Sequence, residues 1–195
     1  MPVISVNDAQ LYYDDQGTGD QTMLFAHGLL WSGRMFRSQI DALQSQYRCI
    51  SVDFRGHGNS EVTAGGYEIE QLTRDIIGLI ESLALPSVHF VGLSMGGFVG
   101  MRIAISRPDL LSSLTLLNTS ADIEAFANRC RYRLLTYLAT WFGLRSVASL
   151  VMRVMFAPAF LDDPNRQTEH EFWRNELLSN QIAGVTRATK AAMCE

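Results

Sequence analysis

The sequence predicts an α/β fold in which a mostly parallel central sheet is flanked by helices and carries a helical cap. Three observations support this prediction. Short apolar runs alternate with amphipathic stretches between Val3 and Asn118, as expected for strands and helices that build a parallel sheet. A glycine-rich turn at residues 92–97 joins one apolar run directly to a helix. After Ala121 the strand-like runs stop, and only amphipathic stretches follow.

Composition restricts the class of protein. The chain has 195 residues, of which 47% are hydrophobic and 18% are charged. These values are typical of one globular domain with a large core and exclude disordered, collagen-like and coiled-coil chains. The formal net charge is −4 and no run of lysine or arginine exceeds two residues, so we expect no nucleic acid or membrane partner. The expected partner is a small-molecule substrate.

Targeting signals and cysteines point to the cytoplasm. The N-terminus lacks the basic start and apolar stretch of a secretory signal, and the apolar stretch 144–158 is too short and too charged to span a bilayer. The three cysteines are odd in number and widely spaced, which argues against a disulfide framework or a zinc ribbon. We therefore expect a cytoplasmic protein whose cysteines are free thiols, namely Cys49, Cys130 and Cys194.

The first elements alternate regularly along the chain. Two β-rich runs around Asn7-Asp8 predict a hairpin, and the apolar run 22–26 predicts a strand buried on both faces. Apolar residues spaced by three and four predict a helix after an N-cap at Ser32, with Phe36, Ile40, Leu43 and Tyr47 on its buried face. A second buried strand at 49–54 is followed by the loop 55–60.

The same alternation continues to Asn118. A helix at 69–83 ends before Pro86, and strand 88–93 leads through the glycine-rich turn into a helix that includes 98–106. The apolar run 114–118 predicts another strand. Such alternation predicts helices on both faces of the sheet.

The remainder is predicted to be helical. Its amphipathic stretches need an apolar surface to cover, so we expect them to sit over one edge of the sheet as a lid. The predicted division is a core at 1–120 and a cap at 121–195, without the final core strands. The predicted cap helices span 126–142, 144–156, 165–178 and 182–193.

The strongest chemical signal is the G-x-S-x-G pattern at residues 92–96. The glycines suit a strained turn in which strand and helix backbones approach closely, and this turn exposes the Ser94 hydroxyl at the carboxyl end of the sheet. The Met95 N–H then faces negative charge that develops near Ser94. The alternative is a glycine-rich loop that serves packing or phosphate binding.

A second signal follows the strand at 22–26. In this fold class the loop there supplies another N–H to an oxyanion, which we assign to Leu29, while His27 is expected to hold the loop by hydrogen bonds. The nearby Gly56-His57-Gly58 is not a dinucleotide fingerprint, because Glu61 stands where the third glycine is required.

These motifs carry a resemblance to a known family. In chain order, His27-Gly28 after a strand, DFRGHGNS at 53–60 and GLSMGG at 92–97 resemble the α/β-hydrolase fold family, particularly its cofactor-free esterase, enol-lactonase and haloperoxidase-like branch. The resemblance covers the chain from about Val3 to Asn118, and the helical remainder is similar to the family's cap in position and character.

The resemblance implies roles for three residues. Ser94 would be the nucleophile, and the backbone N–H groups of Leu29 and Met95 would stabilise the oxyanion, with no cofactor and no metal. Because the nucleophile position holds serine and not aspartate, the haloalkane dehalogenase and epoxide hydrolase branches are disfavoured.

A serine nucleophile also requires a histidine and an acid, which in this fold follow it in the chain. Only His170 follows Ser94, on a stretch with acidic neighbours that is typical of a solvated helix face. Asp122 or Glu124 could be an acid in an alternative position. His57 and His89 precede Ser94, and His89 is better explained as a structural histidine within a strand.

The sequence thus leaves two classes of function open. The first is a serine hydrolase for an ester, lactone or similar acyl group, or a related acyl-transfer or halide-peroxidation enzyme. The second is a catalytically silent hydrolase-fold protein that binds a small ligand or a partner, or a partial chain. An oligomer or a complementing segment could cover its open sheet edge. In the first case cap residues would shape an apolar pocket, the candidates being Phe126, Tyr132, Trp141, Phe142, Met152, Met155, Phe156 and Trp173.

Overall fold

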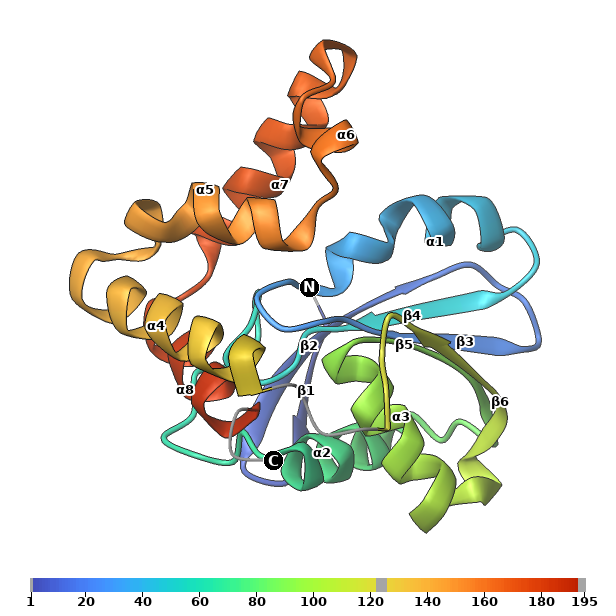
Figure 1. Ribbon diagram of the computed structural model, residues 1–195. Helices are drawn as coiled ribbons and strands as arrows, with labels where there is room; N and C mark the ends of the chain where they lie inside the picture. The colour runs from blue at the N-terminus through green and yellow to red at the C-terminus, as the bar shows by residue number, and fades with distance from the viewer. Residues whose placement is uncertain (1, 122–125, 193–195) are drawn as a thin grey trace.

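The computed structural model describes residues 2–121 and 126–192. Its centre is a six-stranded sheet in the order β1-β2-β4-β3-β5-β6 (Figure 1). The first two pairs of neighbours are antiparallel and the other three are parallel, so the predicted mostly parallel sheet is confirmed. The strands are β1 (Val3–Val6), β2 (Ala9–Gln16), β3 (Thr22–Ala26), β4 (Arg48–Val52), β5 (Val88–Leu93) and β6 (Leu111–Leu117).

Two predicted strands have different bounds. The strand predicted at 49–54 ends at Val52, because the Asp53 carboxylate accepts the backbone N–H groups of Gly33 and Asn59 and turns the chain out of the sheet. β6 begins at Leu111, before the predicted start. Its serines lie on an exposed surface, where a polar side chain loses no hydration on folding, so the strand there is not a continuous apolar run. The hairpin, β3 and β5 lie where the sequence predicts them.

Helices cover both faces of the sheet, as predicted (Figure 1). The helix predicted from Ser32 to Tyr47 is shorter and divided, with a 3₁₀ helix η1 (Gly33–Phe36) before α1 (Arg37–Leu43). Ser32 stands at the N-cap of η1, as predicted, although its side chain makes no capping hydrogen bond. The other two core helices are α2 (Ile69–Ser82) and α3 (Met95–Ser106).

The core lies on the two sides of the sheet. On one side α2 and α3 pack on the strands through fully buried Leu24, Ile50 and Ile76. On the other side Phe36 and Ile40 pack against Phe25, at the centre of a smaller cluster. Cys49, in that cluster, and Cys130 are free thiols as predicted, whereas Cys194 lies outside the described residues.

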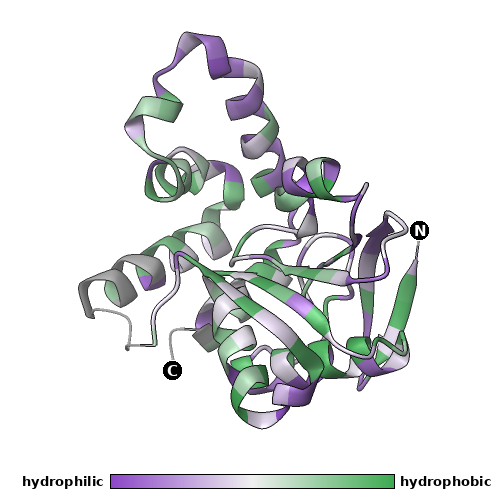
Figure 2. Cartoon of the chain, turned by 90° about the vertical axis from the view of Figure 1, so that its right-hand side faces the viewer, coloured by the Kyte–Doolittle hydropathy of each residue, from purple (hydrophilic) through white to green (hydrophobic). Residues whose placement is uncertain are grey.

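After residue 125 the described chain consists of helices joined by short connections and contains no strand. A hydrophobic cluster joins these helices and includes Trp31 from the loop after β3. Hydrophilic residues gather in the outer part of this region, around α6 and α7 (Figure 2). No described helix is long and apolar enough to cross a membrane. The helices are α4 (Phe126–Phe142), α5 (Leu144–Met155), α6 (Pro158–Leu161), α7 (Gln167–Ser179) and α8 (Ile182–Ala192), with 3₁₀ helices η2 (Pro108–Leu110) and η3 (Pro164–Arg166).

This helical segment contacts the loops that follow two central strands. A Cβ on Gly184 of α8 would lie 2.1 Å from the Gly56 carbonyl oxygen, so the two backbones touch. Near β3, Trp31 packs edge-on against Phe156 and Trp173, with ring centroids 5.6 Å away in each case. The segment therefore lies over the carboxyl ends of β3 and β4, and not over an edge strand.

Candidate active site

The turn between β5 and α3 holds Ser94 in an unusual backbone conformation. Its φ of 49° and ψ of −111° are rare for a residue with a side chain and cost on the order of 1–3 kcal/mol. The neighbouring strand holds the turn in place, because the Ser94 N–H donates to the Leu117 carbonyl at 2.9 Å. The Ser94 carbonyl in turn accepts the N–H groups of Gly97 and Phe98 and the hydroxyl of Thr119.

The glycines around Ser94 have no room for a side chain. A Cβ on Gly92 would lie 2.4 Å from the Gly96 carbonyl oxygen, and one on Gly96 would lie 2.2 Å from the Ala26 carbonyl oxygen. A Cβ on Gly97 would meet the Thr119 side chain at 2.5 Å. The turn therefore packs directly on the end of β3, as the motif predicts.

The structure brings the loop after β3 against Ser94. The Gly96 N–H donates to the His27 carbonyl at 3.1 Å, and a Cβ on Gly28 would lie 3.5 Å from the Ser94 Cβ. Leu29 follows Gly28 directly in this loop. Met95 is the first residue of α3, so its N–H has no acceptor within the helix. Leu29 and Met95 thus flank Ser94, while their assignment as oxyanion donors stays a prediction.

His27 holds this loop, as predicted. Its Nε2 accepts the Phe54 N–H at 3.0 Å, which leaves Nδ1 to donate to the Gly28 carbonyl at 2.7 Å. Complete burial lowers the pKa of His27 well below its ordinary value, and the adjacent His57 adds to this effect. Because both ring nitrogens of the neutral His27 imidazole are hydrogen-bonded to backbone groups, His27 holds the loop in place.

The other histidines lie in three different places. His57 is buried beside His27, and burial lowers its pKa to about 4. Its Nε2 is buried without a hydrogen-bond partner in the described structure. His89 is bonded through Nδ1 to the Ser113 hydroxyl at 2.8 Å, which confirms its structural role. His170 lies in the helical segment, and Asp122 and Glu124 lie outside the described residues.

Asp53 is an important polar residue that sequence reasoning missed. Oδ1 and Oδ2 accept the backbone N–H groups of Gly33 at 2.7 Å and Asn59 at 2.9 Å, so the carboxylate joins the loops after β3 and β4. Burial nevertheless raises its pKa to about 6. The sequence feature that could have identified Asp53 is its position directly after a buried strand and before the glycine-rich loop 55–60.

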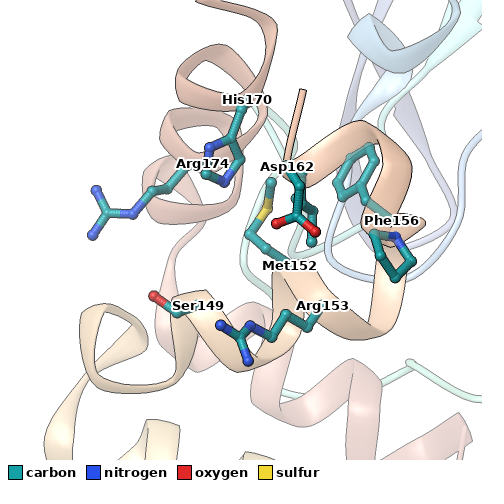
Figure 3. A pocket seen from close by; sticks show the side chains of 9 residues that line it. Ser149, Met152, Arg153, Phe156, Asp162, His170 and Arg174 are labelled. Atoms are coloured by element: carbon teal, nitrogen blue, oxygen red, sulfur yellow. The ribbon is translucent and has the colours of Figure 1, made fainter. Parts of the chain in front are cut away.

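A cavity of about 460 Å³ lies in the helical segment (Figure 3). Neither Ser94 nor the loop after β3 lines it. Of the residues predicted to shape a pocket, Met152 and Phe156 line this cavity and Trp173 packs beside Phe156. The lining residues are Ser149, Met152, Arg153, Phe156, Pro158, Leu161, Asp162, His170 and Arg174.

The remaining predicted pocket residues do not line this cavity. Trp141 and Phe142 are 80% and 72% exposed and Met155 is 39% exposed, so for them a place in a pocket wall stays a prediction. The amphipathic spacing that suggested these residues shows that each helix has an apolar face, but it does not show which part of the protein covers that face. The side chains of Phe126 and Tyr132 lie outside what the structure describes. The described residues also contain no group of three side chains suited to hold a metal ion.

Comparison with known sequences agrees with this architecture. Residues 21–183 match a family model described as alpha/beta hydrolase fold. The chain is 32% identical over 194 residues to 3-oxoadipate enol-lactonase 2 of Acinetobacter baylyi, covering 98% of this chain and 68% of that protein. RutD of Azorhizobium caulinodans is 32% identical over 130 residues, and the match spans 49% of its length.

Solved structures give the same result. The enol-lactonase from Burkholderia xenovorans LB400 has a TM-score of 0.89 and 27% identity, over 97% of this chain and 72% of that one. The malate-bound thermophilic esterase from Thermogutta terrifontis has a TM-score of 0.87 and 27% identity, over 100% of this chain and 72% of that one.

Proposed function

Because this chain belongs to the α/β-hydrolase fold family, we propose that it hydrolyses a carboxylic ester or lactone with the Ser94 hydroxyl as nucleophile. The observation that carries the proposal is the Ser94 turn, in which a serine at positive φ directly precedes α3. The names of two similar proteins, an enol-lactonase and an esterase, support the substrate class. The proposal includes a core at 1–120 that carries Ser94 and a cap at 121–195.

The proposed reaction has two steps. Ser94 Oγ attacks the carbonyl carbon and loses its proton to a base, and the alcohol oxygen leaves with a proton. Water then attacks the acyl-enzyme, releasing the carboxylic acid and restoring the serine hydroxyl. The N–H groups of Leu29 and Met95 would stabilise the negative oxygen in each step, by about 3 kcal/mol for each donor.

Among the described residues no histidine or carboxylate side chain is hydrogen-bonded to the Ser94 hydroxyl. His27 has both ring nitrogens bonded, and His170 lies in the cavity that Ser94 does not line. The reactivity of the Ser94 hydroxyl is therefore the quantity to measure first.

A fluorophosphonate measures this reactivity directly, since it phosphonylates activated serines. Incubation of the purified chain should give one adduct by intact mass, and Ser94→Ala should give none. Ser112→Ala, which removes an exposed serine hydroxyl on β6, should label like the wild type. Labelling that persists in Ser94→Ala would contradict the proposal. A folded but unlabelled wild-type chain would instead support a catalytically silent protein of the same fold.

A further inference from the structure

The cavity between α5, α6 and α7 has the dimensions of a small-molecule site. Its volume of about 460 Å³ falls within the range of roughly 300–1,000 Å³ found for ligand pockets. No residue of the Ser94 turn lines it. Whatever occupies this cavity is therefore held by the helical segment alone.

One wall of the cavity is apolar and well supported. Met152 is 1% exposed, and Phe156 and Leu161 are half-buried. Trp31 and Trp173 pack on Phe156 from behind, with ring centroids 5.6 and 6.0 Å away. This wall can cover a hydrocarbon chain or an aromatic ring without first rearranging.

The polar lining is mainly cationic. Arg153 of α5 and Arg174 of α7 both line the cavity. In Figure 3 the Arg174 guanidinium points outward, away from Phe156, and the Ser149 hydroxyl lies between the two arginines. Within the described part of the chain, neither guanidinium has an ion pair or a hydrogen bond. Other surface arginines do have carboxylate partners, for example Arg34 with Glu176 at 2.7 Å and Arg107 with Glu81 at 2.6 Å.

We propose that this cavity binds a small monocarboxylate with an apolar body. The carboxylate would accept hydrogen bonds from Arg153 and Arg174, which form strong, geometrically defined pairs with planar anions. The hydrocarbon part would lie on the apolar wall that contains Met152 and Phe156. Asp162, the acidic residue of the lining, would repel a second anionic group. The site does not depend on the function proposed for Ser94.

Calorimetric titration of the full chain with 4-phenylbutyrate tests the proposal. One molecule should bind per chain, and the uncharged 4-phenylbutanamide should bind at least tenfold more weakly. The double variant Arg153→Gln/Arg174→Gln should also weaken phenylbutyrate binding at least tenfold. Asp162→Asn should strengthen it several-fold, because a repulsive charge is removed.

Two variants complete the test. Arg145→Gln removes an exposed charge of α5 outside the cavity, so it should leave the affinity within twofold of the wild type. Ser94→Ala should bind phenylbutyrate as the wild type does. The proposal is overturned if phenylbutyrate does not bind, if the double arginine variant binds unchanged, or if Ser94→Ala abolishes binding, which would place the ligand at the Ser94 site.

Discussion

The side-chain amide of Asn180 donates from Nδ2 to the carbonyl oxygen of Leu30 at 2.8 Å, which joins the α7–α8 junction to the loop after β3. Leu30 has a φ of 71°, a conformation that a residue with a side chain seldom adopts. The same nitrogen lies 3.2 Å from the carbonyl oxygens of Glu176 and Leu177 in the last turn of α7. One buried amide therefore holds both the end of a helix and the loop that contains Leu29.

Asn180→Ala should lower the free energy of unfolding by about 1–3 kcal/mol, because it leaves the Leu30 carbonyl without the donor that Asn180 provides. Asn180→Asp should be comparably destabilised, since a carboxylate cannot donate to three carbonyl oxygens. Urea unfolding measures both. Ser179→Ala, which removes an exposed hydroxyl bonded to Glu176, is the control and should change stability by less than about 0.5 kcal/mol. An unchanged midpoint for Asn180→Ala would contradict the prediction.

Gly96→Ala should destabilise the fold by more than about 3 kcal/mol, because its Cβ would overlap the Ala26 carbonyl and neither backbone can move independently. Gly65→Ala is the matched control, since a Cβ there has no neighbour within 4 Å. It should be neutral or slightly stabilising. Thermal unfolding of the two variants provides the comparison, and equal midpoints would show that the close approach does not matter.

Asp53 should affect the pH dependence of stability. Burial raises its pKa to about 6, compared with about 3.9 in an unfolded chain. Between about pH 4 and pH 6 the folded state thus retains a proton that the unfolded state has lost. Rising pH therefore weakens the fold through this group, by about 3 kcal/mol over the interval.

Comparison with Asp53→Asn isolates this effect. Burial lowers the pKa values of His27 and His57, so these groups make stability rise with pH over part of the same range. The variant lacks the opposing carboxylate, and its free energy of unfolding should rise more steeply from pH 4 to pH 6 than that of the wild type. Urea titrations at several pH values give both slopes. Parallel curves would show that Asp53 titrates normally.

The buried pair of Arg55 and Asp75 should be far more sensitive than an exposed pair. Two hydrogen bonds of 2.7 and 2.8 Å join the groups, and their side chains are 0% and 1% exposed. Asp75→Asn should cost about 3–5 kcal/mol, because it leaves the buried guanidinium with the exposed carboxylate of Asp8 as its remaining described ion-pair partner. Glu81→Gln, in the exposed pair with Arg107, should leave the midpoint of urea unfolding close to that of the wild type. Similar losses in the two variants would contradict this reasoning.

Local patterns predicted the sheet and the position of Ser94. The buried strands are continuous apolar runs in the sequence, which predicts them directly. The glycines at 92–97 are required by contacts within a few residues of Ser94 or with the adjacent strand end, so they too form a local pattern. The strand end at Val52 was not predictable in the same way, because it depends on a hydrogen bond to the Asp53 carboxylate from Gly33, the first residue of η1.

The features that the sequence did not predict depend on contacts between distant parts of the chain. Asn180 and Leu30 are separated by 150 positions, and no periodicity joins them. The exposure of Trp141 and Phe142 likewise depends on how α4 is oriented, whereas their spacing shows only that the helix is amphipathic. Sequence patterns identify which faces are apolar, but the neighbour of each face is decided by the tertiary arrangement.

The edge-to-face contact between Trp31 and Trp173 also has an optical consequence. Their rings lie 5.6 Å apart at 86°, and they belong to the loop after β3 and to α7 respectively. Two indoles held this close in a fixed, asymmetric orientation give a strong near-ultraviolet circular dichroism signal. Separation of α7 from the loop would abolish that signal while the far-ultraviolet signal of the helices remained. The near-ultraviolet signal therefore reports, without any added label, whether the helical segment is in contact with the loop after β3.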